Sequence, residues 1–171
     1  MKKSNIAIIV TLAVLIALVA IIALVNRNAM RLPGDSAALL VFSESGAHRE
    51  YTIDELKDLP SVEIEKSIAS SKHEDETGVF TGVPLETLLT DADPGWQGKY
   101  DEFLFTGEDG FVSSVFASDV EQPENVLVVY AKDGETLKGS DEGGKGPLRI
   151  IVVSDTFGNR SAYLLKSIEA K

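Results

Sequence analysis

The apolar residues divide the chain into one unbroken run, a short polar stretch and a long region of alternating pattern. Residues 6–25 contain no charged residue, and Thr11 is the only polar side chain among them. Twenty helical residues cover about 30 Å, which is the thickness of the hydrocarbon core of a bilayer. We therefore expect a transmembrane helix at 6–25, after a cytoplasmic tail at 1–5. A linker at 26–37 follows, with turn-forming residues near its end.

The alternative for this run is a cleaved signal peptide, whose apolar core usually has about 7–15 residues before a small-x-small cleavage site. The run is longer than that, and Asn26-Arg27-Asn28 after it is a poor cleavage context. Both observations favour an uncleaved anchor. The basic residues on the two flanks differ little in number, and the distal flank soon becomes acidic. We expect a single-pass cell-membrane protein whose domain, residues 38–171, faces outside the cytoplasm.

Within residues 38–171, short apolar runs separated by turn residues predict hairpins and two short helices. Strands are expected at 38–42, 48–52, 61–68, 103–105, 111–116, 125–131, 147–153 and 161–168. One helix is expected at 52–60, between a capping pattern and a proline, and another from Pro84 onward. The runs 125–131 and 147–153 are almost wholly apolar, which is typical of strands covered on both faces. The pattern indicates an α+β fold with a mixed sheet and hairpins.

Charge and cysteine content narrow the classes of function. The chain after Arg31 carries 12 of the 16 basic residues and all 27 acidic residues, a formal charge of −15. This argues against nucleic acid as a partner, because nucleic acid requires a cationic face. The chain has no cysteine and only two histidines, so we expect no disulfide and predict no metal site from ligand spacing.

Four short blocks occur in a fixed order over the last ninety residues. They are Thr81-Gly82-Val83-Pro84-Leu85, Glu108-Asp109-Gly110-Phe111, Lys132-Asp133-Gly134-Glu135 and Gly143-Gly144-Lys145-Gly146-Pro147-Leu148-Arg149. Their succession resembles the oxidoreductase molybdopterin-binding domain of the sulfite oxidase family, over roughly residues 50–170. The resemblance implies that family's fold, with a Gly-Val-Pro-Leu turn into a helix and a Gly-Pro-Leu-Arg strand in the core.

The chain departs from the family's pattern at two points. Enzymes of this family hold molybdenum through a cysteine thiolate, which this chain cannot supply. The equivalent region lies between Val62 and Gly78, where the candidate replacement ligands are Ser67, Ser70, Ser71 and His73. Active members also carry a Ser-x-Lys-Trp segment near the cofactor, and here Ser161-Ala162-Tyr163-Leu164 keeps only the serine. Ligation by cysteine is therefore excluded, and bound molybdopterin stays open.

The resemblance places a pocket near Phe111, Arg149 and the glycine loop at 143–146. Its candidate cofactor-binding residues are Phe111, Gly144, Lys145, Arg149 and Ser161. Arg149 could pair with a phosphate through its guanidinium fork, or it could be a structural arginine paired with a carboxylate. The glycine loop could offer backbone N–H groups and one cation to an anion, or simply connect two strands.

Three interpretations of function follow. The first is a membrane-tethered domain that has lost the family's chemistry and binds a ligand or a redox or surface protein partner. The second is an active molybdopterin-dependent oxidoreductase with a ligand other than cysteine. The third is an interaction domain whose pocket is filled by its own apolar side chains. Metal content would separate the first two.

Overall fold

The computed structural model describes residues 39–43, 46, 48–70 and 74–171, all within the unit Asp35–Lys171. The predicted tail, transmembrane helix and linker lie outside the described residues. Among the described residues, no helix has the length and apolar character needed to cross a membrane.

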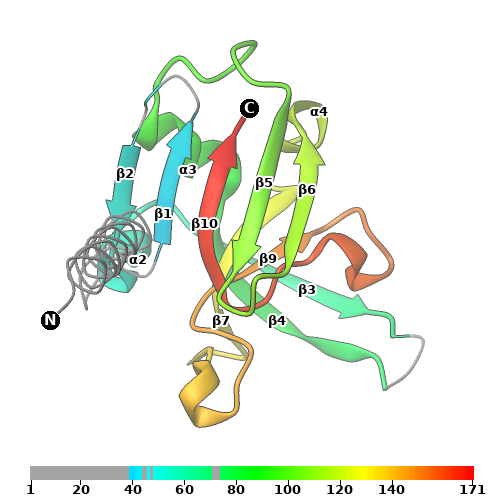
Figure 1. The fold of residues 1–171 in the computed structure, drawn as a ribbon. Coiled ribbons are helices and arrows are strands. Elements are labelled where there is room, and N and C mark those ends of the chain that lie inside the picture. The colour runs from blue at the N-terminus through cyan, green and yellow to red at the C-terminus, as the bar shows by residue number, and fades with distance from the viewer. Residues whose placement is uncertain (1–38, 44–45, 47, 71–73) are drawn as a thin grey trace, which may run out of the picture. The chain divides into compact units, whose positions relative to one another are not determined.

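Ten strands and a few short helices make up the described part of the chain (Figure 1). The strands are β1 (Leu39–Ser43), β2 (His48–Tyr51), β3 (Val62–Ile68), β4 (Glu76–Pro84), β5 (Glu102–Gly107), β6 (Val112–Phe116), β7 (Val126–Lys132), β8 (Glu135–Thr136), β9 (Arg149–Val152) and β10 (Leu165–Ala170). The helices are α2 (Ile53–Asp58), α3 (Leu85–Ala92), α4 (Ala117–Val120) and the 3-10 turns η1 (Ser140–Glu142) and η2 (Gly158–Arg160). The predicted α+β class is confirmed.

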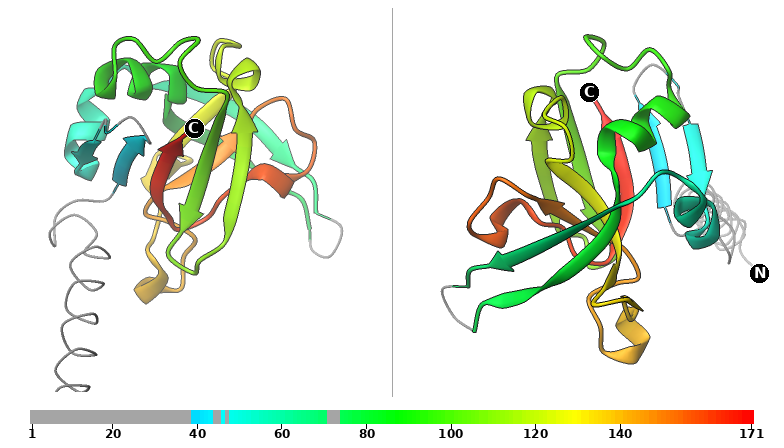
Figure 2. Two further views of the ribbon diagram at one scale, coloured as in Figure 1. Left: turned by 45° about the horizontal axis from the view of Figure 1, so that its top comes forward. Right: turned by 180° about the vertical axis from the view of Figure 1, so that it is seen from behind.

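The strands form two sheets. Sheet A has the order β2-β1-β10-β5-β6, and all its pairs are antiparallel except β1 with β10. Sheet B has the order β3-β4-β7, and both β9 and β8 pair with the far edge of β7. The β3–β4 hairpin extends away from the rest of the domain (Figure 2).

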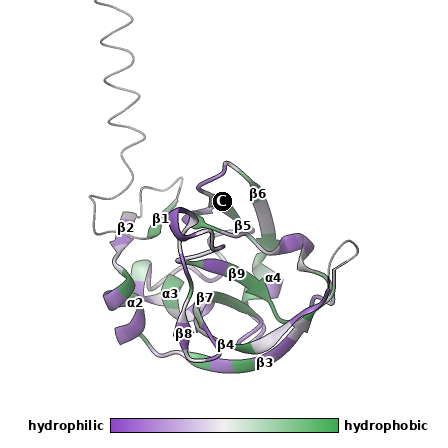
Figure 3. Cartoon of the chain, turned by 90° about the horizontal axis from the view of Figure 1, so that it is seen from below, coloured by the Kyte–Doolittle hydropathy of each residue, from purple (hydrophilic) through white to green (hydrophobic). Residues whose placement is uncertain are grey.

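The main core lies between the two sheets and includes α3. Leu85, Leu88 and Leu89 of α3 are buried in it, as the sequence pattern predicts. β7 is buried at its first six positions. Val126, Val128 and Tyr130 face the main core, and Leu127 and Val129 face a smaller apolar cluster on the other side of sheet B. Hydrophobic colour accordingly marks β7, whereas α2 is largely hydrophilic (Figure 3). The prediction that this strand is covered on both faces is confirmed.

The first predicted helix begins at its predicted cap. The Thr52 hydroxyl accepts a hydrogen bond from the Glu55 backbone N–H at 3.2 Å, and the Thr52 N–H donates to the Glu55 carboxylate at 2.8 Å. Each interaction satisfies a backbone donor that the first helical turn leaves free. The helix ends at Asp58, and Leu59, immediately before Pro60, has an extended backbone.

Two predicted boundaries were wrong. The block Thr81–Leu85 was expected to be a turn, but β4 runs through Pro84 because these residues pair with β7. The last strand was expected from Ser161, but β10 starts at Leu165. Leu164 has φ +51° and its N–H donates to the carbonyl of Lys145, so its backbone bonds to a neighbouring loop instead of a sheet. The sequence analysis also missed α4.

Candidate functional site

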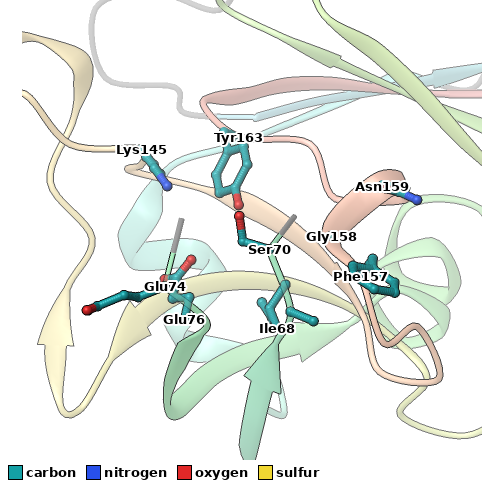
Figure 4. Close-up of a pocket in the computed structure, with 10 residues that line it drawn as sticks. Ile68, Ser70, Glu74, Glu76, Lys145, Phe157, Gly158, Asn159 and Tyr163 are labelled. Carbon is teal, nitrogen blue, oxygen red and sulfur yellow. The ribbon is translucent and has the colours of Figure 1, made fainter. Parts of the chain in front are cut away.

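A pocket of about 350 Å³ opens where the end of β3 meets the loop before β10 (Figure 4). It is lined by Ile68, Ala69, Ser70, Glu74, Glu76, Lys145, Phe157, Gly158, Asn159 and Tyr163. The Tyr163 ring lies between Lys145 and Ser70, with its hydroxyl end turned toward Ser70 (Figure 4). The walls are thus mixed, with charged groups on one side and apolar side chains on the other.

Backbone and ionic contacts hold the segment 153–160, which contributes Phe157, Gly158 and Asn159 to one wall of the pocket. Ala69 donates its N–H to the carbonyl of Thr156 at 2.9 Å, which joins the end of β3 to the wall. Lys66 donates to the carbonyls of Val153 and Asp155. Arg160 of η2 bridges Asp155 at 2.6 Å and Asp119 of α4 at 2.7 Å. The wall is therefore fixed from two sides before any ligand binds.

From two lining residues, Lys145 and Tyr163, a stack of alternating cations and aromatic rings continues into the domain. Lys145 Nζ lies 4.8 Å from the centre of the Tyr163 ring, and the Arg149 guanidinium lies 4.6 Å from the same ring. Arg149 is also 5.3 Å from the centre of the Phe80 ring, and Lys132 Nζ is 5.4 Å from it. Ring faces carry negative potential and attract cations. The two rings thus stabilise three positive charges that lie near one another.

Arg149 is the most buried charge of this stack. Its side chain is 1% exposed, and Nη1 donates to Glu76 Oε1 at 2.9 Å. Among the described residues, its Nε and Nη2 groups have no hydrogen-bond partner. These two N–H groups form the edge of the guanidinium that binds oxyanions with two parallel hydrogen bonds. A buried donor without an acceptor is costly, so this edge is suited to an oxygen ligand absent from the protein itself.

Glu76 is the acidic partner in the stack. It lies 2.9 Å from Arg149 Nη1 and 3.5 Å from Lys132 Nζ. Burial raises the pKa of its carboxyl, but the charges of Arg149, Lys132 and Lys145 together with the Arg149 hydrogen bond outweigh burial, so its pKa lies below the usual value. Three cations thus face this one half-buried carboxylate, a local positive excess in an otherwise strongly acidic protein.

The structure brings two of the five predicted site residues together here. Lys145 lines the pocket, and Arg149, which is not a lining residue, packs against the lining residue Tyr163. Ser161 is buried just behind the lining residue Gly158, to whose carbonyl it donates its N–H. Phe111 is 47% exposed at the β5–β6 hairpin and does not line the pocket.

Gly144, the remaining predicted site residue, packs against the backbone of Lys138, where an added Cβ would lie 2.1 Å from the carbonyl oxygen. The N–H groups of Gly143, Gly144 and Gly146 all donate to carbonyls of nearby loop residues. The glycine loop therefore does not present these N–H groups to an anion. Its contribution to the pocket is the Lys145 side chain.

The candidate serine ligands separate in the structure. Ser70 lines the pocket, whereas the Ser67 hydroxyl accepts a hydrogen bond from Thr77 at 2.9 Å. Ser71 and His73 lie outside the described residues. No cluster of three or more histidine, aspartate or glutamate side chains suited to a metal occurs in the described part of the chain.

Glu76 and Phe157 were not among the predicted site residues, and Tyr163 was noted only as a difference from the Ser-x-Lys-Trp pattern. Glu76 reaches Arg149 from 73 residues away, at the start of a strand that the sequence pattern did not reveal. The Tyr163 ring contacts two cations, Lys145 and Arg149.

Comparison with known proteins agrees with this fold. The family described as oxidoreductase molybdopterin binding domain matches residues 31–171, and the chain belongs to that family. Among solved structures, the sulfane dehydrogenase SoxCD from Paracoccus pantotrophus is similar, with a TM-score of 0.65 and 16% sequence identity. The match covers 83% of this chain and 40% of that chain, so this chain spans less than half of its length. Comparison with curated proteins gives no match.

The residues present fit only part of the family's cofactor. The unpaired edge of Arg149 and the Lys145 cation suit an anionic group. The molybdenum end lacks its soft thiolate ligand, because the chain contains no cysteine. The molybdenum end of the cofactor would therefore need a ligand other than cysteine.

Proposed function

We propose that this protein is a catalytically degenerate member of its family that binds a small oxyanion-bearing ligand. Its domain is held at the outer face of the cell membrane by the helix at 6–25. The chemistry is recognition: Arg149 and Lys145 supply positive charge, and Tyr163, Phe157 and Ile68 supply stacking and apolar contact. Without a metal ligand of the family's kind, the pocket selects a ligand and performs no oxidation.

One observation carries this proposal, namely the buried unpaired Nε–Nη2 edge of Arg149 beside a pocket. Burial without partners at two donors costs free energy that a bound oxyanion would recover. Lys145 lines the same pocket and contacts the Tyr163 ring, which the Arg149 guanidinium also contacts, so two cations lie close to the position of the ligand. The acidic surface of the domain repels anions, so this positive site would be a favourable place for an anion to bind.

The ligand claim is tested by titrating the full-length protein, in mild detergent, with inorganic sulfate and following its thermal unfolding. We expect sulfate to raise the melting temperature, because a ligand that binds only the native state stabilises it. Lys145→Gln should reduce the shift. Lys138→Gln removes an exposed lysine of the same loop that does not line the pocket, and it should leave the shift unchanged. Equal shifts in all three proteins would refute binding at this pocket.

The claim of lost chemistry is tested by metal and pterin analysis after expression in a host that makes molybdopterin. We expect neither molybdenum nor tungsten to copurify in a fixed ratio with the chain. Ser70 in the pocket lining favours a second candidate, an active oxidoreductase with serine ligation. That candidate requires about one metal atom per chain and its loss in Ser70→Ala, because a ligand must be present for a site to hold its metal.

Membrane placement is tested by fractionation and by protease treatment of intact cells. We expect the chain in the membrane fraction, with its acidic domain cleaved by external protease. A soluble chain, or a domain protected in intact cells, would contradict this part of the proposal. A redox or surface protein partner, and the exclusion of nucleic acid, stay predictions from the sequence.

A further inference from the structure

Glu76 lines the pocket of the proposed ligand and is already paired with one of its cations, Arg149. Its carboxylate contacts one end of the Arg149 guanidinium, and the unpaired edge is the neighbouring side of the same planar group. Glu76 and Lys145 both line the pocket, so an anion held there by Lys145 would lie near the Glu76 carboxylate as well. The two negative groups would share the same cations and repel each other.

The charged groups around Glu76 come from several segments. Arg149 projects from β9, Lys132 from β7, and Lys145 from the loop that precedes β9. On the acidic side, Glu74 lines the same pocket and is exposed to solvent. The Asp133 carboxylate also lies beside Lys132, since both side chains come close to the position of a Cβ on Gly78. The three cations still hold the pKa of Glu76 below its usual value.

We infer that Glu76 is a built-in counter-ion of the anion site and that ligand binding is coupled to its protonation. This inference rests on the proposed function, because it describes the regulation of the same pocket. Glu76 neutralises part of the positive charge while the pocket is empty, and it takes up a proton when a bound anion supplies that negative charge instead.

The direction of the coupling follows from the charges. Without ligand, the three cations hold the pKa of Glu76 below its usual value. A bound anion cancels part of that positive field and repels the carboxylate, so it raises the pKa. Between the two pKa values, binding takes up a proton, and affinity rises as pH falls, by up to tenfold per pH unit for one coupled proton. Above and below this window, affinity no longer depends on Glu76.

The test is calorimetric titration of the full-length protein with sulfate, which keeps its charge where Glu76 titrates. Titrations span about pH 4 to 8, a range that covers the pKa of a carboxyl on both sides. Each pH uses two buffers with different enthalpies of ionisation, because the difference in heat reports the protons taken up. We expect stronger sulfate binding and net proton uptake toward acidic pH. A merely structural ion pair would give neither signal.

Two variants assign the proton to a residue. Glu76→Gln removes the competing charge while its amide oxygen can still accept from Arg149. It should bind sulfate more tightly than wild type near neutral pH, with no proton uptake. Glu65→Gln, at an exposed carboxylate of β3 that does not line the pocket, should behave as wild type. Proton uptake that persists in Glu76→Gln would overturn the inference.

The outcomes also separate this inference from the proposed function. Sulfate binding that is flat with pH and takes up no proton in wild type would refute the role of Glu76 and leave the anion site standing. Absence of sulfate binding at every pH, in wild type and in Glu76→Gln, would refute the anion site and the inference together. If Glu76→Gln fails to fold, the wild-type proton uptake alone decides.

Discussion

At the scale of single residues, the stability of the site depends most on one buried arginine. Arg149 is 1% exposed, and its one hydrogen-bonded carboxylate partner in the described residues is Glu76. Removing a partner from a buried ion pair is strongly destabilising, because a charge remains in a poorly solvating interior. The stability of the domain should therefore respond to Glu76 far more than to neighbouring acidic residues.

We predict that Glu76→Ala lowers the free energy of unfolding by about 3 kcal/mol, the lower end for a broken buried pair because Glu76 is partly exposed. Glu74→Ala should change it by less than about 0.5 kcal/mol, as exposed positions usually do. Urea unfolding of both variants measures the difference. Similar values for the two variants would mean that Arg149 does not depend on Glu76.

The same pair should make the domain sensitive to acid. The pKa of Glu76 is lowered in the folded state, so its contribution is complete above the unfolded value of about 4.3 and is lost as pH falls further. Urea midpoints measured from neutral to acidic pH should therefore fall less steeply for Glu76→Gln than for wild type. Parallel curves would argue against a lowered pKa.

At the scale of elements, the close approach of β4 and β7 depends on a glycine. A Cβ on Gly82 would lie 2.6 Å from the carbonyl oxygen of Val128 and 2.8 Å from Cα of Val129. Backbone atoms of a central strand cannot move aside easily. The register of this strand pair shifts between Thr81 and Gly82, so the glycine sits where the two backbones are brought together irregularly.

We predict that Gly82→Ala destabilises the domain by about 3 kcal/mol, the upper end of the usual cost of overpacking. Gly95→Ala is the matched control, because nothing lies within 4 Å of a Cβ at that position. Thermal unfolding of the two variants should separate them clearly. A mild effect of Gly82→Ala would show that β4 can shift along β7.

Most elements were predictable because their signals are local. The Thr52 cap and the leucines of α3 predicted helices, and continuous apolar sequence predicted β7. The extension of β4 was missed, since its residues become a strand only by pairing with β7. The site was predictable as far as Lys145 and Arg149, whose block resembles the family. Glu76 was not, because its role comes from tertiary proximity across 73 residues.

At the scale of the whole molecule, sheet A joins the two ends of the described sequence. β10 lies between β1 and β5, and Ile168 of β10 is fully buried in the main core. The pairing of β1 with β10 is parallel and connects residues more than 120 positions apart, such as Val41 and Ile168. The core between the sheets is complete only when this strand is in place.

We predict that Ile168→Ala lowers the free energy of unfolding by about 3 kcal/mol, through lost apolar burial and the cavity left behind. Ser167→Ala, on the adjacent and partly exposed position, should change it by less than about 0.5 kcal/mol. Chemical unfolding measures both. Equal effects would indicate that the strand contributes through its backbone alone.

The position of β10 also bears on when the domain can fold in the cell. Sheet A lacks its middle strand until residues 165–170 have been synthesised. Until then the β1–β2 hairpin cannot be joined to the β5–β6 hairpin. Long-range pairings of this kind form slowly, since the chain must close a large loop first. For a chain delivered across a membrane, the domain could not finish folding while residues 165–170 were still in transit, so sheet A would be completed only after they had crossed.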